Sequence, residues 1–306
     1  MALKSLKILA LLGFSLEKEG SLDEKLILNF KVPNNLGLAA GLDKNGDYID
    51  SLSSLGFGFL EIGTVTPKPQ PGNLKPRLFR IKSEKALINK MGFNNKGVDH
   101  LVSNLKKSKT TTPIGISIGK NFDTPNELAY KEYIFCLDRT YEYADYFAIN
   151  ISSPNTKGLR DLETEQELGS LLLTIKKRQI YLADKHGYKP LFLKISPDNN
   201  EESLKSICEA IKDNSIDGII CSNTTTDHNY LSRSGGLSGK PLMKLSTKAL
   251  SLSRKFLGDG FPIIASGGVM SAEDYYEKID SGADLVQIYT GFIYHGPQLI
   301  DDILNK

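Results

Sequence analysis

The feature that most constrains the fold of this chain is a regular alternation between short apolar runs and segments with helical spacing. Eight runs rich in apolar and β-branched residues recur along the sequence, at residues 36–41, 59–65, 114–120, 146–152, 191–196, 218–224, 262–268 and 285–291. Most of these runs are continuously apolar, which is typical of parallel strands that are covered on both faces. Between them, apolar residues recur three and four positions apart, which predicts helices.

The number of runs decides between two fold classes. At roughly 150 residues per domain, the 306 residues suggest two domains. However, α/β barrels of about 250 residues fold as a single domain. A doubly wound sheet predicts a G-x-G-x-x-G turn after the first strand, and residues 40–43 (AGLD) do not match that motif. Eight strands separated by helices are the number in a (β/α)8 barrel. We therefore predict an α/β fold, a (β/α)8 TIM barrel over residues 21–306, with a short helical segment over residues 1–20.

The N-terminal segment has the pattern of an imperfect amphipathic helix. Over residues 2–12, Leu3, Leu6 and Leu9 share one face, and two lysines occupy the opposite face. Such a helix either packs on its own domain, or it rests on a membrane surface or forms the mouth of an apolar tunnel, and the pattern does not separate these interpretations. No segment approaches the ~20 apolar residues that a bilayer-spanning helix needs.

Two further segments lie outside the eight repeated units. Residues 25–30 alternate loosely between polar and apolar side chains, which predicts a hairpin that closes the floor of the barrel. Residues 66–94 include a stretch rich in Pro, Gly and Asn and form a long insertion after the second predicted strand. Long insertions at the C-terminal face of a barrel usually shape a binding site.

Composition excludes several classes of function. Lys and Arg total 38 and Asp and Glu total 36, so the charge gives no sign of a nucleic-acid partner. The three cysteines are far apart, so we expect no disulfide framework and a reducing compartment. No four-ligand Cys/His spacing occurs, so we predict no metal site. Neither a histidine nor a pair of carboxylates stands at a predicted strand end, which disfavours Ser-His catalysis, metal hydrolysis and glycosidase chemistry.

The polar residues at the predicted strand ends are mainly amides, hydroxyls and lysines. In a barrel of this type the C-terminal strand ends form the active-site face. Lys44 and Lys194 are the best-placed cations, and a site rich in Asn, Lys and Thr suits a planar, anionic ligand that makes many hydrogen bonds. Glycines at 235–239, 267–268 and 291 follow the last three strands, which indicates either a phosphate-bearing cofactor or ordinary turn chemistry.

Seven motifs, in order along the chain, resemble those of the dihydroorotate dehydrogenase family. They are AAGLDKNG (39–46), EIGTVTPKPQPGN (61–73), INKMGFNN (88–95), INISSPNTKGLR (149–160), NTT (223–225), GGLSGKPL (235–242) and VQIYTGF (286–292). The resemblance runs from about residue 36 to residue 304 and is most specific for class 2, the membrane-associated enzymes that reduce a quinone. It implies an FMN-containing flavoprotein, an oxidoreductase that oxidises (S)-dihydroorotate to orotate in de novo pyrimidine (UMP) biosynthesis, with a quinone as the final electron acceptor.

The class assignment depends mainly on Ser153. In this family the catalytic base lies in the loop after the fourth strand, and it is Ser in class 2 and Cys in class 1. The matching residue here is Ser153, and none of the three cysteines lies in that loop. The resemblance also implies that Thr156 and Phe93 order the path of the proton. Two alternatives stay open: a class 1-like FMN enzyme that uses fumarate or NAD, and a non-catalytic flavin-binding barrel.

The resemblance implies three further sets of site residues. The set that binds dihydroorotate and orotate is Lys44, Asn89, Lys90, Met91, Gly92, Phe93, Asn150, Asn155, Asn223 and Thr224. The set that binds FMN is Ala39, Ala40, Gly41, Leu42, Asp43, Thr64, Ser117, Asn150, Lys194, Ser222, Gly239, Gly268, Tyr289 and Thr290. The residues on the quinone side are Arg80 and Tyr289.

The chain departs from the family pattern at two places. Family members usually carry Asn where this chain has Ser117, and because serine is shorter we expect a water between its hydroxyl and the flavin. Class 2 enzymes usually carry two helices before the barrel, whereas about twenty residues precede the floor hairpin here, so either the quinone tunnel is shorter or more open, or the sequence is truncated. We expect a monomer attached peripherally to the cytoplasmic side of the inner (cell) membrane through residues 2–12.

Overall fold

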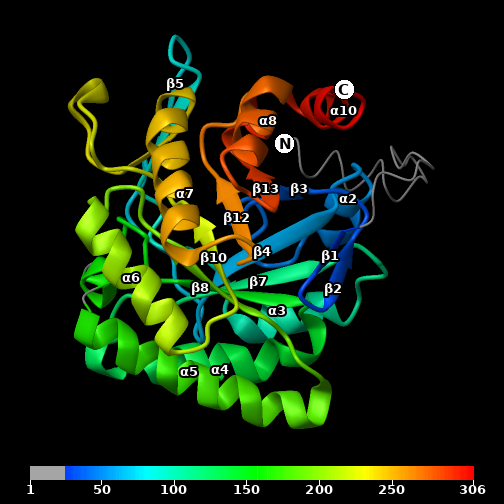
Figure 1. Ribbon diagram of the computed structural model, residues 1–306, viewed down its shortest axis with the longest axis vertical. Coiled ribbons are helices and arrows are strands. Elements are labelled where there is room, and N and C mark those ends of the chain that lie inside the picture. The colour runs from blue at the N-terminus through cyan, green and yellow to red at the C-terminus, as the bar shows by residue number, and fades with distance from the viewer. Residues whose placement is uncertain (1–24, 157, 164) are drawn as a thin grey trace.

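The computed structural model describes residues 25–306 with the exception of residues 157 and 164. Within that part, eight parallel strands close into a barrel in the order β10-β12-β13-β3-β4-β7-β8-β9 (Figure 1). The strands are β3 (Leu36–Leu38), β4 (Phe59–Val65), β7 (Ile114–Ile118), β8 (Tyr146–Asn150), β9 (Leu191–Ile195), β10 (Gly218–Cys221), β12 (Ile263–Ser266) and β13 (Leu285–Ile288). Each strand lies within one of the eight predicted runs, so the predicted (β/α)8 barrel is confirmed.

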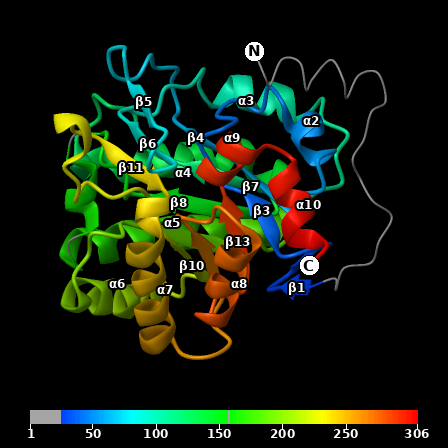
Figure 2. The same ribbon diagram turned by 90° about the horizontal axis from the view of Figure 1, so that it is seen from above.

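Helices surround the barrel and cover the outer face of its strands (Figure 2). They are α2 (Ile49–Ser53), α3 (Val98–Leu105), α4 (Ala129–Thr140), α5 (Glu165–His186), α6 (Glu201–Asp213), α7 (Met243–Leu257), α8 (Ala272–Asp280), α9 (Thr290–His295) and α10 (Gln298–Leu304). Short 3-10 helices occupy Asn126–Leu128, Tyr141–Tyr143, Leu159–Glu163, Tyr230–Ser232 and Lys240–Leu242. Helix α6 illustrates why these segments are helical and pack on the barrel. Leu204, Ile207 and Ile211 form its buried face, and the Asn200 side chain caps its N-terminus.

A hairpin closes the N-terminal end of the barrel, as the sequence predicts. β1 (Lys25–Ile27) pairs antiparallel with β2 (Phe30–Val32). Phe30 stacks on Tyr146 with 5.4 Å between the ring centroids, and both side chains are buried inside the barrel. Gly115 makes room for this layer, because a Cβ there would lie 2.0 Å from the Tyr146 ring. This end is a packed apolar core, so a ligand site belongs at the opposite end of the barrel.

A separate three-stranded antiparallel sheet outside the barrel was not predicted from the sequence. Its strand order is β11-β6-β5, with β5 (Leu78–Ile81), β6 (Ala86–Asn89) and β11 (Gly236–Gly239). β5 and β6 come from the predicted insertion over residues 66–94, and β11 comes from the loop after β10. The sheet therefore joins two barrel loops that are far apart in the sequence.

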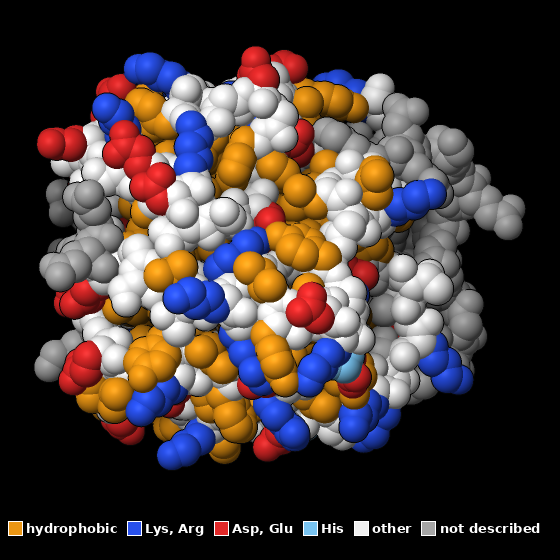
Figure 3. Space-filling model, turned by 60° about the horizontal axis from the view of Figure 1, so that its bottom comes forward, with side chains coloured by type: hydrophobic (Ala, Val, Ile, Leu, Met, Phe, Trp, Pro, Cys, Tyr) orange, Lys and Arg blue, Asp and Glu red, His pale blue; other side chains and the backbone are white. Residues whose placement is uncertain are grey.

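The charge distribution on the surface and the hydropathy of the helices indicate which kinds of partner the protein can contact. On the face shown in Figure 3, Lys and Arg side chains are interspersed with Asp and Glu side chains. Within residues 25–306, no helix is both long enough and apolar enough to cross a membrane. The predicted helix over residues 2–12 lies outside the residues that the structure describes.

Candidate active site

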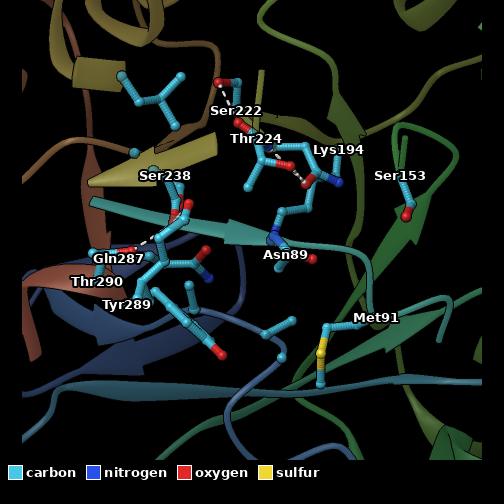
Figure 4. A pocket seen from close by; sticks show the side chains of 18 of the residues that line it. Asn89, Met91, Ser153, Lys194, Ser222, Thr224, Ser238, Gln287, Tyr289 and Thr290 are labelled. Atoms are coloured by element: carbon cyan, nitrogen blue, oxygen red, sulfur yellow. Dashed lines mark hydrogen bonds between the residues drawn. The ribbon is translucent and has the colours of Figure 1, made fainter. Parts of the chain in front are cut away.

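A cavity opens at the C-terminal ends of the barrel strands, where the sequence predicts the site. Figure 4 shows Ser153 on one side of this cavity and Tyr289 and Thr290 on the other. Most predicted site residues line it, namely Ala39, Ala40, Gly41, Lys44, Thr64, Asn89, Met91, Gly92, Phe93, Asn150, Ser153, Asn155, Lys194, Ser222, Asn223, Thr224, Gly239, Gly268, Tyr289 and Thr290. The fold thus gathers side chains from most of the chain length into one site.

Six predicted residues do not line the cavity: Leu42, Asp43, Lys90, Ser117, Thr156 and Arg80. Asp43 is buried, and its carboxylate accepts hydrogen bonds from the backbone amides of residues 45, 47 and 48 at 3.2, 3.0 and 2.7 Å. It therefore shapes the loop that carries Lys44. Arg80 is exposed on β5, where its guanidinium lies 5.0 Å from the ring centroid of Tyr294.

Ser117 lies behind the cavity wall. Its side chain is fully buried, and its hydroxyl forms a 2.8 Å hydrogen bond with the hydroxyl of Thr64. Thr64 in turn accepts a 2.7 Å hydrogen bond from Asn150 Nδ2, and both of these residues line the cavity. Ser117 therefore does not contact the cavity itself, but it holds the side chain of Thr64, which does.

Ser153 follows β8 and is buried, with 6% of its surface exposed. Its Oγ accepts a hydrogen bond from the backbone N–H of Asn155 at 3.3 Å, which stabilises negative charge that develops on this oxygen. Thr156 is also buried, and its Oγ1 has no hydrogen-bond partner among the described residues. A buried hydroxyl of this kind is a ready site for a bridging water.

Phe93 lines the cavity from the loop that follows β6. Its backbone lies in the left-handed region, with φ at 49°, which costs a non-glycine residue about 1–3 kcal/mol. Two side-chain amides hold the loop there, since the carbonyl of Phe93 accepts hydrogen bonds from Gln70 Nε2 at 3.1 Å and from Asn95 Nδ2 at 2.7 Å. The aromatic ring is therefore fixed at the wall of the cavity.

Four asparagines form two hydrogen-bonded pairs on the wall. Asn155 Nδ2 donates to Asn89 Oδ1 at 2.9 Å, and Asn223 Nδ2 donates to Asn150 Oδ1 at 3.3 Å. Each amide offers donors and an acceptor, so the pairs present alternating hydrogen-bonding groups. That pattern suits a flat ring whose edge carries both N–H and C=O groups.

Lys44 supplies a cation to the same cavity. Its Nζ donates to the carbonyl of Gly41 at 2.6 Å, and it forms no ion pair with a residue in the described part of the chain. Burial, and after it the charge of Arg77, lowers the pKa of Lys44 to about 8, although Asp43 opposes the shift. A desolvated ammonium without a carboxylate partner favours the binding of an anionic group.

Lys194 reaches the cavity from inside the barrel and is paired there. Its Nζ lies 3.0 Å from Glu61 Oε1, and both side chains are buried. The other carboxylate oxygen of Glu61 accepts hydrogen bonds from Gln287 Nε2 at 2.7 Å and from the Tyr146 hydroxyl at 3.2 Å. Burial raises the pKa of Tyr146 well above its usual range, and the charge of Glu61 adds to the shift. Removing one partner of such a pair costs about 3–5 kcal/mol.

Eight residues of the wall were not predicted: Leu78, Leu87, Ser238, Leu242, Ser266, Val269, Gln287 and Ile288. Gly267 also lines the wall, and it was predicted only as part of a possible phosphate-binding turn. Gln287 and its partner Glu61 carried a usable signal, because each is a polar residue inside an apolar strand. The apolar members carry no such signal, since a cavity wall and a core strand use the same side chains.

Two observations test whether these residues fit a phosphate-bearing planar cofactor. Gly267 and Gly268 both have positive φ, and a Cβ on Gly268 would lie 2.3 Å from Met243 Cα, so only glycine leaves the backbone this close to the N-terminus of α7. Such a turn lets backbone N–H groups approach a phosphate. Gln287 also lines the cavity, and its Oε1 is buried without a hydrogen-bond partner among the described residues. The residues therefore fit such a cofactor.

The fold and this cavity define a (β/α)8-barrel protein with a site for a flat, phosphate-bearing cofactor beside a small anionic ligand. The family profile of dihydroorotate dehydrogenase matches residues 22–306. The chain therefore belongs to the dihydroorotate dehydrogenase family, whose members are flavin-dependent.

Relatives and solved structures agree with this assignment. The chain is 52% identical over 280 residues to dihydroorotate dehydrogenase (quinone) from Vibrio parahaemolyticus, with 89% of this chain and 83% of the relative covered. It is 52% identical over 280 residues to the protein of the same name from Shewanella woodyi, with 89% and 82% covered. The crystal structure of DHODH from Eimeria tenella in complex with ferulenol superimposes with a TM-score of 0.92 at 34% identity, covering 99% of this chain and 89% of that one.

Proposed function

We propose that this chain oxidises (S)-dihydroorotate to orotate and passes the electrons to a quinone, in de novo pyrimidine biosynthesis. The observation that carries the proposal is Ser153, a buried hydroxyl on the wall of a cavity to which no cysteine contributes. The curated relatives at 52% identity carry the name of the quinone-dependent enzyme, which supports the same assignment.

We propose FMN as the resident flavin. FMN, when bound, supplies the hydride acceptor for the reaction. The backbone at Ala39–Gly41, together with Thr64 and Lys194, would hold the ring system, and Ser222, Gly239, Gly268, Tyr289 and Thr290 would hold the ribityl and phosphate groups. Ser117 would act on this set through Thr64, and Leu42 and Asp43 through the loop that they form.

Ser153 would remove the proton from C5 of dihydroorotate while the hydride leaves C6. A serine hydroxyl is a weak base in water, so it needs a dry environment and a group that stabilises its negative charge. Ser153 has both, because it is buried and its Oγ accepts the N–H of Asn155. Thr156 and Phe93 would order the onward path of the proton through a water, for which the unpartnered Thr156 hydroxyl is available.

Lys44 and the asparagine pairs would hold the substrate. The ammonium of Lys44 would pair with the carboxylate of dihydroorotate, and Asn89, Asn150, Asn155 and Asn223 would bind the amide edges of its ring. Thr224, Met91, Gly92 and Phe93 complete the wall on this side, with Lys90 in the adjoining loop. Substrate orientation thus depends on side chains that are already hydrogen-bonded to one another.

We further propose that the quinone approaches from the side of Arg80 and Tyr289. Residues 1–20 would form a helical segment that contacts the cytoplasmic surface of the inner membrane, and residues 21–306 would form the catalytic barrel. The protein would act as a monomer attached peripherally. The quinone-dependent naming of the relatives supports a membrane-associated enzyme.

The test is a comparison of electron acceptors. The purified protein should carry bound FMN and oxidise dihydroorotate with a soluble quinone analogue, with little or no turnover when fumarate or NAD replaces the quinone. Turnover only with fumarate or NAD would contradict the quinone assignment. A colourless protein without flavin absorbance would contradict the cofactor assignment.

A further inference from the structure

A buried lysine lies outside the proposed catalytic set, behind the glycine turn of the cofactor site. Lys278 belongs to α8 and has no exposed surface. Its Nζ donates to Ser246 Oγ at 2.7 Å and to Thr247 Oγ1 at 2.8 Å, both near the start of α7. Figure 2 shows α7 and α8 side by side on the outside of the barrel.

The positive charge of Lys278 has no carboxylate within ion-pair distance among the residues that the structure describes. Cys221, and after it Glu277 and Asp274 of its own helix, stabilise this charge only at longer range. Burial lowers its pKa to about 8. Its hydroxyl partners satisfy N–H donors but carry no negative charge. The position is also close to the N-terminus of α7, where the helix dipole already presents positive charge. A cation buried at the positive end of a helix is unfavourable unless an anion binds nearby.

A short chain of contacts connects Lys278 to the cavity wall. Ser246 Oγ lies 2.9 Å from the carbonyl oxygen of Gly267, which lines the cavity. Because Lys278 donates to Ser246 Oγ, the single hydroxyl hydrogen of the serine is free to be donated to a carbonyl. Three carbonyl oxygens lie within reach, those of Leu242 at 2.9 Å, Met243 at 3.0 Å and Gly267 at 2.9 Å, so the hydroxyl ties the start of α7 to the glycine turn. Gly268 packs against the first residue of α7, Met243. Lys278 is therefore placed to fix the glycine turn.

We propose that Lys278 is a positioning residue and a buried counter-charge for the phosphate group of the flavin. It acts through Ser246 on the Gly267–Gly268 turn, and its positive charge adds to that of the α7 N-terminus. The inference rests on the proposed FMN cofactor but not on the identity of the oxidised substrate or of the electron acceptor.

The test compares FMN with riboflavin, which lacks the phosphate. The full-length chain is loaded with either flavin, and each dissociation constant is measured from the recovery of flavin fluorescence on dilution. Lys278→Met should raise the dissociation constant for FMN at least ~tenfold and leave that for riboflavin within about twofold, because only FMN carries the anion. The 31P resonance of bound FMN should shift in the same variant.

Lys176→Met is the matched control. Lys176 is also buried, but it pairs with Asp217 at 3.2 Å and does not line the cavity. This variant should leave the ratio of the two dissociation constants unchanged. Ser246→Ala keeps the charge and breaks the link to the turn, so it should weaken FMN binding selectively but by less than Lys278→Met. If Lys278→Met does not fold, Lys278→Gln and Ser246→Ala carry the test with the same measurements.

Each result distinguishes a Lys278 that supports binding of the flavin phosphate from a Lys278 that only stabilises the fold. Equal weakening of FMN and riboflavin binding in the Lys278 and Ser246 variants would overturn the inference, and so would unchanged binding of both. A wild-type protein that binds neither flavin would overturn the cofactor assignment and this inference together. Failure to oxidise dihydroorotate, with the FMN selectivity intact, would contradict only the proposed function.

Discussion

Ser153 is the single residue on which the proposed chemistry depends most. Replacing it with alanine removes the base without altering the cofactor contacts, so flavin reduction by dihydroorotate should slow at least ~100-fold while FMN stays bound. The measurement is the anaerobic rate of loss of flavin absorbance after mixing with dihydroorotate. Ser51→Ala, a buried serine of α2 away from the cavity, should react at the wild-type rate. An unchanged rate in Ser153→Ala would remove this residue from the mechanism.

We expect Lys44 to make the binding of orotate dependent on pH. Its pKa of about 8 means that the ammonium is charged below that pH and is lost as the pH rises through it. Orotate should therefore bind best below about pH 8 and progressively more weakly above it, approaching a tenfold loss per pH unit until the pKa of the complex is reached. Titration of the flavin spectrum with orotate at about pH 6 to 9.5 measures this. Lys44→Met should bind weakly at every pH, and a wild-type affinity that does not change across this range would contradict the role of Lys44.

At the scale of single residues, the sequence identified the side chains at strand ends and a few within strands, such as Lys194, but it missed Glu61 and Gln287. Lys44, Ser153 and the asparagines stand where parallel strands end, so their convergence follows from the fold. Glu61 and Gln287 lie inside strands, and only the closed barrel shows that Glu61 meets both Lys194 and Gln287. The position of Ser117 behind Thr64 also required the three-dimensional structure.

The element that most shapes the substrate side is the sheet of β5, β6 and β11. It places Asn89 opposite Gly236, whose carbonyl accepts the Asn89 amide at 3.1 Å. A Cβ on Gly236 would lie 2.0 Å from Thr224 Oγ1, so Gly236→Ala must displace Thr224. We expect orotate affinity to fall at least ~tenfold while FMN remains bound, because a small misplacement of binding groups is enough to lose that much.

The control for this prediction is Gly169→Ala. Gly169 lies in α5, and a Cβ there would meet only one atom, 3.9 Å away. This variant should bind orotate as the wild type does, as measured by titration of the flavin spectrum. Wild-type orotate affinity in Gly236→Ala would show that the sheet does not set the position of Thr224.

The same sheet contains a strand, β11, that local sequence patterns do not predict. The barrel strands were predicted because most of them are continuous runs of apolar residues, many of them β-branched, which is a local property. β11 is Gly-Leu-Ser-Gly, which has neither alternation nor β-branched residues, and its pairing partner β6 lies 147 residues away at Asn89–Gly236. Such a strand forms because the barrel brings two distant loops together. A short stretch of sequence holds only one of these loops, so it cannot predict their pairing.

At the scale of the whole molecule, we expect the three cysteines to be unreactive. Cys136, Cys208 and Cys221 are buried and free, and burial raises the pKa of all three thiols, to about 12 for Cys208 and Cys221. The thiolate is the reactive form, so a thiol alkylating reagent at neutral pH should label none of them in the folded protein and all three after denaturation. Mass spectrometry counts the labels. Labelling of the native protein that abolishes dihydroorotate oxidation would point to a cysteine base instead of Ser153.

The central claim is that one cavity takes electrons from dihydroorotate and delivers them to a quinone. Anaerobic mixing of the oxidised protein with dihydroorotate, followed by separate mixing with a soluble quinone analogue, fumarate or NAD, measures the two half-reactions independently. We predict that dihydroorotate bleaches the flavin absorbance and that the quinone restores it rapidly, while fumarate and NAD restore it slowly or not at all. A flavin that dihydroorotate does not bleach, or one that only fumarate or NAD reoxidises, would contradict the claim.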